Sequence, residues 1–334
     1  MTQYVALYRK YRPQSFKDVV GQDQVVTLLE NSIKQKKIGH AYLFCGGRGT
    51  GKTTVARIFA RDIGCNPEDI IEIDAASNRG IDEIRELRDA VRTAPFSSPY
   101  KVYIVDEAHM LTKEAANALL KTLEEPPSHV VFILATTDPD KLPQTIVSRC
   151  QKVEFKQPDI QTLVDRLLYV VEQEVRSLEK ESAELIARHG KGSYRDALGV
   201  LEQILAVSEK KINHEVVMAT LGTPHEETLL ELLDVVCQKN SKGIIDKLKR
   251  LKTRNSSALR TYDEFIELVR QGLLIRIGQL DDKKAELTRI ASTYPHTIGS
   301  KLVLELLEKR HLLEVSDSHS WTAFEAVLLS VVEQ

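Results

Sequence analysis

The sequence predicts a doubly wound α/β domain followed by helices, and three observations support this fold class. Five short runs rich in Val, Ile and Phe are apolar on successive residues, as in a parallel sheet covered on both faces. Helical patterns alternate with these runs, as a doubly wound domain requires. After Gln157 and Pro158, only helical spacing remains. The predicted strands are Ala41–Cys45, Ile70–Asp74, Val102–Asp106, Val130–Ala135 and Val153–Phe155.

The predicted helices end at residues that stop helices. One is followed by Gly64 and another by Pro126 and Pro127. At least five more helices are expected between His225 and Gln334. Those expected before that point are Asp23–Lys36, Lys52–Ile63, Ile81–Arg92, Lys113–Glu125, Asp159–Glu181, Ser182–His189, Ser193–Val207 and His214–Leu221.

The chain is expected to have three parts, because the strand signal ends near residue 157 and a break follows at Gly222-Thr223-Pro224. The parts are an α/β core at 1–157, a small helical lid at 158–222 and a helical C-terminal domain at 223–334. A length of 334 residues is enough for two or three domains.

The composition excludes several classes of protein. Hydrophobic residues make up 42% and charged residues 28%, which is ordinary for a globular chain. No apolar run reaches the roughly 18 residues of a membrane span. Met1–Phe16 is polar and basic without an apolar segment, so no secretory signal is indicated and a cytoplasmic location is expected. Since the net charge is -2, any contact with nucleic acid must come from a local patch.

The four cysteines do not form a metal or disulfide pattern. Cys45, Cys65, Cys150 and Cys237 are far apart, and none belongs to a C-x-x-C pair. The expected state is therefore reduced, mostly buried thiols.

A phosphate-binding loop is indicated by residues 46–53, which fit G-x-x-x-x-G-K-[ST] in full between a strand and a helix. Glycines let backbone N–H groups face phosphate, and the helix N-terminus adds partial positive charge. Lys52 is expected to reach the β- and γ-phosphates and the Thr53 hydroxyl to ligate Mg²⁺. The motif alone does not distinguish adenine from guanine. The expected nucleotide-binding residues here are Gly46, Gly47, Arg48, Gly49, Thr50, Gly51, Lys52, Thr53 and Thr54.

Two acids stand at the end of a strand predicted to be buried, where charges are costly unless they face a ligand. Asp106 is positioned to hold Mg²⁺, and Glu107 to orient and deprotonate a water molecule. The alternative is a solvated strand end followed by a helix cap. His109 could be catalytic, but at this spacing a structural or sensing role is expected.

Two further signals are open to more than one interpretation. Thr136-Thr137-Asp138 follows a predicted strand, where a hydroxyl could polarise water or touch a γ-phosphate, but the same residues also suit a plain turn. Arg149 follows a short helix far along the chain from the phosphate loop, and it could equally be a surface arginine.

Taken together, these motifs resemble the AAA+ clamp-loader ATPases of bacteria. The similarity runs almost unbroken from Tyr8 to Leu221 and is weaker in the C-terminal helices. Several ordered motifs in one chain are more specific than any one of them. Besides the phosphate loop, the segments are Arg9–Phe16, Val19–Gln22, Glu72–Ser77, Asp106–His109, Asn117–Pro127, Ala135–Asp138, Ser148–Cys150 and Gly192–Leu198.

The resemblance implies further roles. Thr137 matches a sensor of the γ-phosphate, and Arg149 matches an arginine finger that acts on ATP held by a neighbouring subunit. Arg195 matches a lid arginine that couples nucleotide state to lid position, although it could be an ordinary ion-pair partner. Arg79 matches a residue that faces the DNA backbone, although it could simply be solvated. The segment that packs on adenine is matched by Tyr11, Arg12, Pro13, Val19 and Val20.

The resemblance also implies an assembly. Such subunits have a five-stranded parallel sheet and join delta- and delta-prime-type subunits in a ring of five held together by a helical collar. ATP and Mg²⁺ let the ring grip a sliding clamp and primed DNA, and hydrolysis releases them. The ring belongs to a replicative DNA polymerase holoenzyme, but no polymerase active site is visible in this chain.

The sequence departs from the family in two places. Family members usually carry a small insert with four zinc-binding cysteines, and here only Cys65 occupies such a position. Since one cysteine cannot make a tetrahedral site, no zinc is expected. The long extension of some members is absent after Gln334, and the sequence leaves open whether this is a natural end.

Three other functions remain alternatives. A small-molecule kinase would not need an arginine finger or the 110 or so helical residues at the C-terminus. A non-hydrolysing scaffold of the ring would be expected to lack Lys52, Asp106 or Glu107, and all three are present. A different AAA+ DNA machine fits Ala135–Asp138 and Asn117–Pro127 less well.

Overall fold

The computed structural model describes residues 4–77, 90–208, 211–222, 224–253, 257–279, 285–314 and 319–333. The chain divides into two compact units, Met1–Asn213 and His214–Gln334. The three-part division predicted from the sequence stays a prediction. No helix within the described ranges has both the length and the apolarity needed to cross a membrane.

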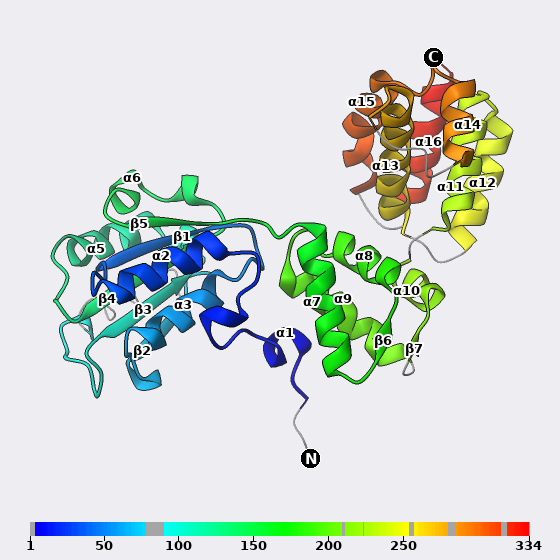
Figure 1. Ribbon diagram of the computed structural model, residues 1–334. Coiled ribbons are helices and arrows are strands. Elements are labelled where there is room, and N and C mark those ends of the chain that lie inside the picture. The colour runs from blue at the N-terminus through cyan, green and yellow to red at the C-terminus, as the bar shows by residue number, and fades with distance from the viewer. Residues whose placement is uncertain are drawn as a thin grey trace. The chain divides into compact units, whose positions relative to one another are not determined.

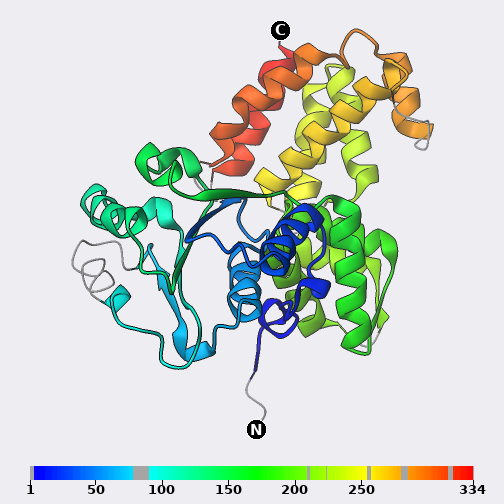
Figure 2. The same ribbon diagram turned by 60° about the vertical axis from the view of Figure 1, so that its left-hand side comes forward.

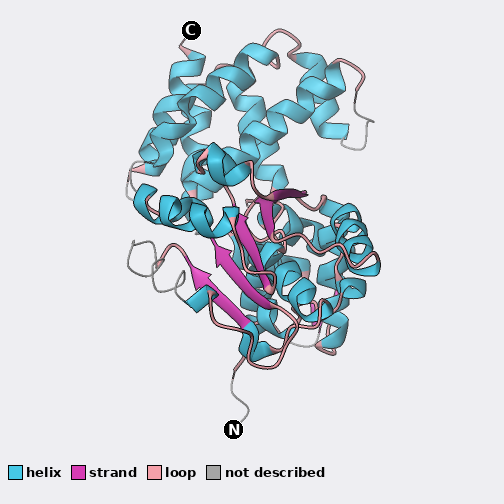
Figure 3. Ribbon diagram, turned by 90° about the vertical axis from the view of Figure 1, so that its left-hand side faces the viewer, coloured by secondary structure: helices cyan, strands magenta, loops and turns pink. Residues whose placement is uncertain are grey.

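The first unit is built on a five-stranded sheet whose strands are all parallel, in the order β2-β3-β4-β1-β5. Figure 3 shows these strands in magenta between layers of helices. The predicted strands are confirmed to within two residues at each end. The strands are β1 (Ala41–Gly46), β2 (Ile70–Asp74), β3 (Lys101–Asp106), β4 (Val130–Thr136) and β5 (Gln151–Phe155).

The buried runs occupy the centre of the sheet. In β1, β3 and β4 almost every residue is buried, which explains why apolar residues follow one another without alternation. The edge strand β2 departs from this expectation, because all five of its residues are partly or fully exposed.

Helices cover both faces of the sheet, as Figure 1 shows. On one face, α2 (Asp23–Lys34) and α3 (Lys52–Asp62) pack apolar side chains against the sheet. On the other face, α5 (Lys113–Glu124) and α6 (Gln144–Val147) do the same. The predicted helix Ile81–Arg92 lies mostly outside the described residues. Short elements of this part are α1 (Leu7–Lys10), η1 (Phe16–Asp18), η2 (Pro67–Asp69), η3 (Ala108–Met110) and η4 (Pro139–Lys141).

The lid is mainly helical, as predicted, but one predicted helix and the absence of strands were wrong. Instead of one helix over Asp159–Glu181, α7 stops at Gln173 because Val175 adopts a left-handed backbone with φ of 57°. The Arg176 N–H donates to Val171 O and closes the helix end. The elements are α7 (Ile160–Gln173), β6 (Ser177–Leu178), α8 (Lys180–His189), α9 (Tyr194–Val207) and β7 (Lys211–Ile212), with β6 and β7 paired in parallel.

All the secondary-structure elements described in the second unit are helices, which confirms the prediction of at least five helices after His225. Its core contains an aromatic cluster in which Phe324 lies between Tyr262 and Trp321. Figure 2 shows these helices in yellow-green to red. They are α10 (His214–Leu221), α11 (Glu226–Cys237), α12 (Ser241–Thr253), α13 (Ala258–Arg276), α14 (Ala285–Thr293), α15 (Ser300–Lys309), η5 (Arg310–Glu314) and α16 (Ser320–Val332).

Candidate nucleotide-binding site

The phosphate-binding motif forms the loop between β1 and α3. Gly46, Gly49 and Gly51 have φ of 153°, 70° and 105°, a region that L-residues rarely adopt. A Cβ at Gly46 would also come within 2.5 Å of Phe155 O. Glycine is therefore required both for the backbone path and for the close approach of β5.

Lys52 begins α3 beneath this loop and is only 6% exposed. Its Nζ donates to the carbonyl oxygens of Gly46 and Gly47, both at 2.8 Å. Burial lowers the pKa of the Lys52 ammonium, and the nearby carboxylates of Glu107 and Asp106 oppose this effect. A buried cation in these surroundings is suited to an anionic ligand.

The loop is joined to the acidic end of β3 by a hydrogen bond. The Thr53 hydroxyl donates to Asp106 Oδ2 at 2.7 Å, and the Glu107 N–H donates to Asp106 Oδ1 at 3.0 Å. The Thr53 and Asp106 oxygens are thus side by side, and a hydroxyl with a carboxylate is a donor set suited to Mg²⁺, which keeps several of its waters.

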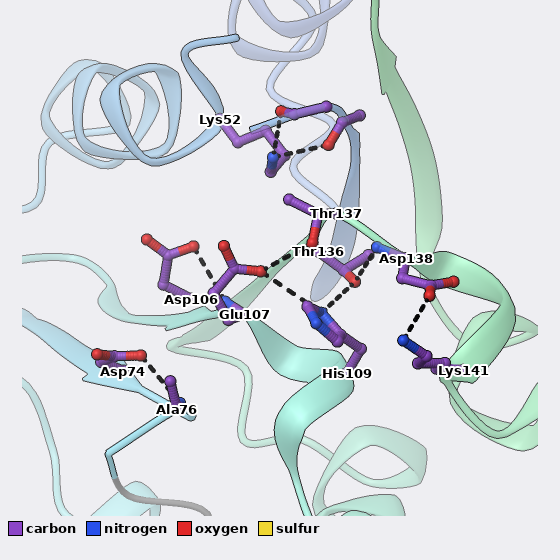
Figure 4. Close-up of polar contacts among 12 residues, drawn as sticks. Lys52, Asp74, Ala76, Asp106, Glu107, His109, Thr136, Thr137, Asp138 and Lys141 are labelled. Atoms are coloured by element: carbon purple, nitrogen blue, oxygen red, sulfur yellow. Dashed lines mark hydrogen bonds and ion pairs between the residues drawn. The ribbon is translucent and has the colours of Figure 1, made fainter. Parts of the chain in front are cut away.

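Glu107 connects the end of β3 to the end of β4. Its Oε2 accepts a hydrogen bond of 3.1 Å from the Thr137 hydroxyl and lies 3.5 Å from His109 Nδ1. His109 Nδ1 is also 3.0 Å from Thr136 Oγ1. Figure 4 shows these side chains converging below Lys52.

A cavity of about 130 Å³ lies beside these groups and is lined by residues from four parts of the first unit. The phosphate loop contributes Arg48–Thr54, the end of β3 contributes Asp106 and the next residue, Glu107, and the lid contributes Arg195. The N-terminal segment contributes the five residues that the family resemblance assigns to adenine: Tyr11, Arg12, Pro13, Val19 and Val20.

Sequence analysis missed several residues of this lining. Tyr194 has the clearest role, because its N–H donates to Gly49 O at 3.1 Å and its hydroxyl to Val20 O at 2.8 Å. Burial raises the pKa of Tyr194 to about 12, so the hydroxyl keeps its proton. Its position next to Arg195 was the available signal. The other missed residues are Tyr8, Asp18, Val55, Arg166 and Leu198.

The N-terminal segment is attached to the lid. Glu174 accepts hydrogen bonds from Lys10 Nζ at 2.7 Å and from the Tyr11 hydroxyl at 2.6 Å. Arg166 donates to Tyr11 O. Gln14, three residues after Tyr11, accepts a hydrogen bond of 2.9 Å at its carbonyl oxygen from Arg61 of α3. The segment that lines the cavity is therefore fixed to the lid before Pro13 and to the core after it.

Two protein families match successive segments of the chain. One is described as DNA polymerase III, delta subunit, and matches residues 21–79 and 66–159. The other is described as DNA polymerase III clamp loader subunit, ATPase lid domain, and matches residues 162–210.

Whole-chain relatives carry related names. The DNA polymerase III subunit gamma of Buchnera aphidicola subsp. Baizongia pistaciae is 34% identical, and the match covers 88% of this chain and 85% of that protein. The chain belongs to the DNA polymerase III gamma/tau family. A longer gamma/tau member, the tau subunit of Bacillus subtilis, is 38% identical over 99% of this chain, which spans 63% of its length.

Solved structures support the fold expected for a gamma/tau protein. The Holliday junction branch migration motor RuvB of Thermotoga maritima matches with a TM-score of 0.54 and 22% identity, covering 68% of this chain and 79% of that chain. At this identity the match bears on the fold alone. It confirms the predicted P-loop α/β fold.

Some predicted site residues of this gamma/tau chain lie away from the cavity lining. Arg149 follows α6, where its Nη2 pairs with Glu124 Oε1 at 2.5 Å and its Nη1 donates to Thr145 O at 2.7 Å. Thr137 reaches the site only through Glu107. Arg79 lies outside the described residues.

Cys65, the family's first zinc position, is a buried thiol here. It is 4% exposed, and its Sγ lies 3.3 Å from Tyr100 O. Burial raises its pKa, which disfavours the thiolate that zinc requires. The absence of zinc stays a prediction.

Proposed function

We propose that this chain is the ATP-driven motor subunit of a bacterial DNA polymerase III clamp loader. It binds and hydrolyses ATP with Mg²⁺ in the cytoplasm to load a sliding clamp onto primed DNA during replication. Its partners are delta- and delta-prime-type subunits in a five-membered ring joined by the helical collar. One observation carries the proposal: in a member of the gamma/tau family, the phosphate loop, the acidic pair and the lid arginine Arg195 face the same cavity.

Charge supports a nucleoside triphosphate as the ligand. Five cationic residues line the cavity against three acidic ones, Asp18, Asp106 and Glu107. The backbone N–H groups of the loop and the N-terminus of α3 add further positive potential. The cationic residues are Arg12, Arg48, Lys52, Arg166 and Arg195.

The base fits the part of the cavity that the N-terminal segment lines. Tyr11, Pro13, Val19 and Val20 offer aromatic and aliphatic surface there, which suits a flat adenine ring. Arg195 enters from α9, with its guanidinium 5.7 Å from the centre of the Tyr8 ring. A residue so placed can respond both to the nucleotide and to the position of the lid.

Hydrolysis requires an oriented water molecule and compensation of phosphate charge. Thr53 and Asp106 would hold Mg²⁺, which neutralises charge on the β- and γ-phosphate oxygens when bound. Lys52 stabilises the same oxygens. Glu107 aligns the attacking water and accepts its proton, while Thr137 holds the Glu107 carboxylate through their hydrogen bond.

Arg149 is suited to act on a neighbouring subunit. Its side chain is 34% exposed, does not line the cavity of its own chain, and is anchored by an ion pair with Glu124. An arginine finger supplied in trans contributes about 10³–10⁵ in rate.

The test is the ATPase rate of the chain reconstituted with partner subunits, sliding clamp and primed DNA. We expect clamp and DNA to stimulate the wild type. Lys52→Ala should abolish turnover and weaken ATP binding, while Arg149→Ala should retain ATP binding and lose at least about 10³-fold in rate. Glu124→Ala is the matched control, because it removes the same ion pair but keeps the arginine.

Either of two results would contradict the proposal. A rate that ignores clamp and DNA would leave only a general P-loop ATPase. Equal losses in Glu124→Ala and Arg149→Ala would mean that the ion pair, rather than the arginine in trans, matters.

A further inference from the structure

Glu107 has an unusual backbone that fixes its position. Its φ and ψ are 49° and 44°, in the left-handed region that residues other than glycine seldom adopt. Its N–H donates to Asp106 Oδ1, and its carbonyl accepts from the Met110 N–H at 2.8 Å. Strain of this kind is found at functional sites and persists where the surroundings over-determine it.

The backbone does not fix the carboxylate, because the side chain can still rotate. Two contacts restrain it at Oε2: the hydroxyl of Thr137 at 3.1 Å and Nδ1 of His109 at 3.5 Å. These contacts come from different elements, the end of β4 and η3, as Figure 4 shows.

His109 is itself held in place. Its side chain is 11% exposed, and its Nδ1 lies 3.0 Å from Oγ1 of Thr136. Thr136 is fully buried in β4, and the same Oγ1 accepts a 3.0 Å hydrogen bond from the Asp138 N–H. The ring is therefore fixed by a residue that cannot easily move.

The Glu107 carboxylate bears on which ring nitrogen of His109 carries the hydrogen. A carboxylate oxygen can only accept, so a lone pair on Nδ1 would face the lone pairs of Glu107. A hydrogen on Nδ1 instead lets the ring donate toward Glu107 while it keeps its contact with Thr136. The His109 ring therefore contacts both Thr136 of β4 and the Glu107 carboxylate.

We propose that His109 is a positioning residue for hydrolysis, with Thr136 behind it, and that the pair keeps the Glu107 carboxylate aimed at the attacking water. This inference rests on the proposed function, since it assigns Glu107 the role of base. The sequence indicates a structural or sensing role for His109, and its contact with Glu107 supports this positioning role. His109 is not among the residues that line the cavity, so it acts through Glu107.

The test compares His109→Phe, which keeps the bulk of the ring without its hydrogen bonds, with His109→Asn, whose Nδ2 can donate from a similar place. Thr136→Val removes the support behind the ring. Lys141→Ala is the control, because it breaks the exposed ion pair with Asp138 without touching Glu107 or His109. All variants are measured in the reconstituted loader with clamp and primed DNA.

We expect His109→Phe and Thr136→Val to lower kcat by about tenfold or more, because small misplacements of a catalytic group are costly. Their affinity for a fluorescent ATP analogue and their KM should stay within about twofold of wild type. His109→Asn should recover most of the loss in kcat, and Lys141→Ala should match wild type.

A second readout does not depend on turnover. Nitrogen-15 shifts of the His109 ring in the chain should show hydrogen on Nδ1, and Glu107→Gln should perturb them. Hydrogen on Nε2 alone would overturn the proposal, as would wild-type kcat in His109→Phe or no recovery in His109→Asn. If His109→Phe fails to fold, Thr136→Val and His109→Asn decide. Absence of ATP hydrolysis in the wild type would instead refute the proposed function.

Discussion

The two units of this chain differ in how many polar side chains they bury. Among the described residues, eight buried polar or charged side chains lie in the first unit and two, Thr261 and Ser320, in the second. The eight are Gln22, Thr50, Lys52, Asp69, Thr122, Thr136, Ser182 and Ser193.

This difference reflects what each unit must hold. In the first unit, most of the buried polar groups belong to the phosphate loop, to the strand end beside it, or to helix starts and loops tied by hydrogen bonds. The exceptions, Thr122 and Ser182, lie within α5 and α8. Each buried polar group costs desolvation that only a specific partner offsets. In the second unit, helices pack through apolar side chains with few such groups. Chemistry and packing are thus largely separated along the chain, and this separation can be tested.

The largest effect is expected from Phe324→Ala in the second unit. Phe324 is fully buried, with its ring 4.9 Å from that of Tyr262 and 6.0 Å from that of Trp321. Truncation should cost about 3–5 kcal/mol of unfolding free energy. Since Trp321 is the sole tryptophan in the sequence, its fluorescence during denaturation reports on this unit.

Nucleotide affinity should stay unchanged in Phe324→Ala under conditions where the second unit remains folded. Leu304→Ala, at a residue that is 59% exposed, is the control and should have little effect on either property. A parallel loss of affinity would break the comparison between the two units.

A smaller effect is expected from Gly49→Ala in the phosphate loop. The glycine has a φ of 70°, and an added Cβ would lie 2.0 Å from Ser193 Oγ. Strain and collision together should cost about 1–3 kcal/mol, measured as a weaker affinity for ATP. Gly199→Ala within α9 is the control, because nothing lies within 4 Å of its Cβ and its backbone is helical. The Trp321 transition should not move in either variant, and equal losses of affinity would contradict the explanation.

The smallest effect is expected at Glu174. Two hydrogen bonds lower the pKa of the Glu174 carboxyl below its ordinary value of 4.5: the one from Lys10 has the larger effect, and the one from Tyr11 the smaller. The stabilisation from the carboxylate is therefore complete above pH 4.5 and is lost as the pH falls through the lower pKa of the folded state.

Glu174→Gln should thus loosen the N-terminal segment by at most about 1 kcal/mol at neutral pH, because the ion pair is partly exposed. Amide hydrogen exchange of residues 7–13 measures this change. The difference between variant and wild type should shrink in acid, and a difference that grew in acid would refute the assignment.

The sheet could be predicted from the sequence because each central strand shows a local run of apolar residues. Val102–Asp106 and Val130–Ala135 are apolar at every position before the strand end, and burial on both faces demands this. The paired two-residue strands Ser177–Leu178 and Lys211–Ile212 have no such signal, because two residues show no period. The end of α7 before Val175 could not be predicted from the sequence either, because a β-branched residue is not expected in a left-handed conformation.

The residues of the site also divide into those that the sequence predicts and those that it does not. Lys52, Thr53 and Asp106 could be predicted from a contiguous motif and a strand end, and the structure brings them together. Arg166 could not, because it stands in no such motif and reaches the cavity only through the docking of the lid on the core. The contact of His109 with Thr136 likewise depends on the parallel neighbours β3 and β4 ending at one edge of the sheet.

The attachment of the N-terminal segment has a mechanical consequence. Tyr11 is tied to the lid by Glu174, and Gln14 is tied to α3 by Arg61, so only Arg12 and Pro13 separate the two anchors. Proline fixes its own φ and restricts the residue before it. The link between the two anchors is therefore short and stiff. A displacement of the lid that keeps both contacts cannot be absorbed within it. Such a displacement is passed on to α3, the helix whose first residues we propose to hold the phosphates.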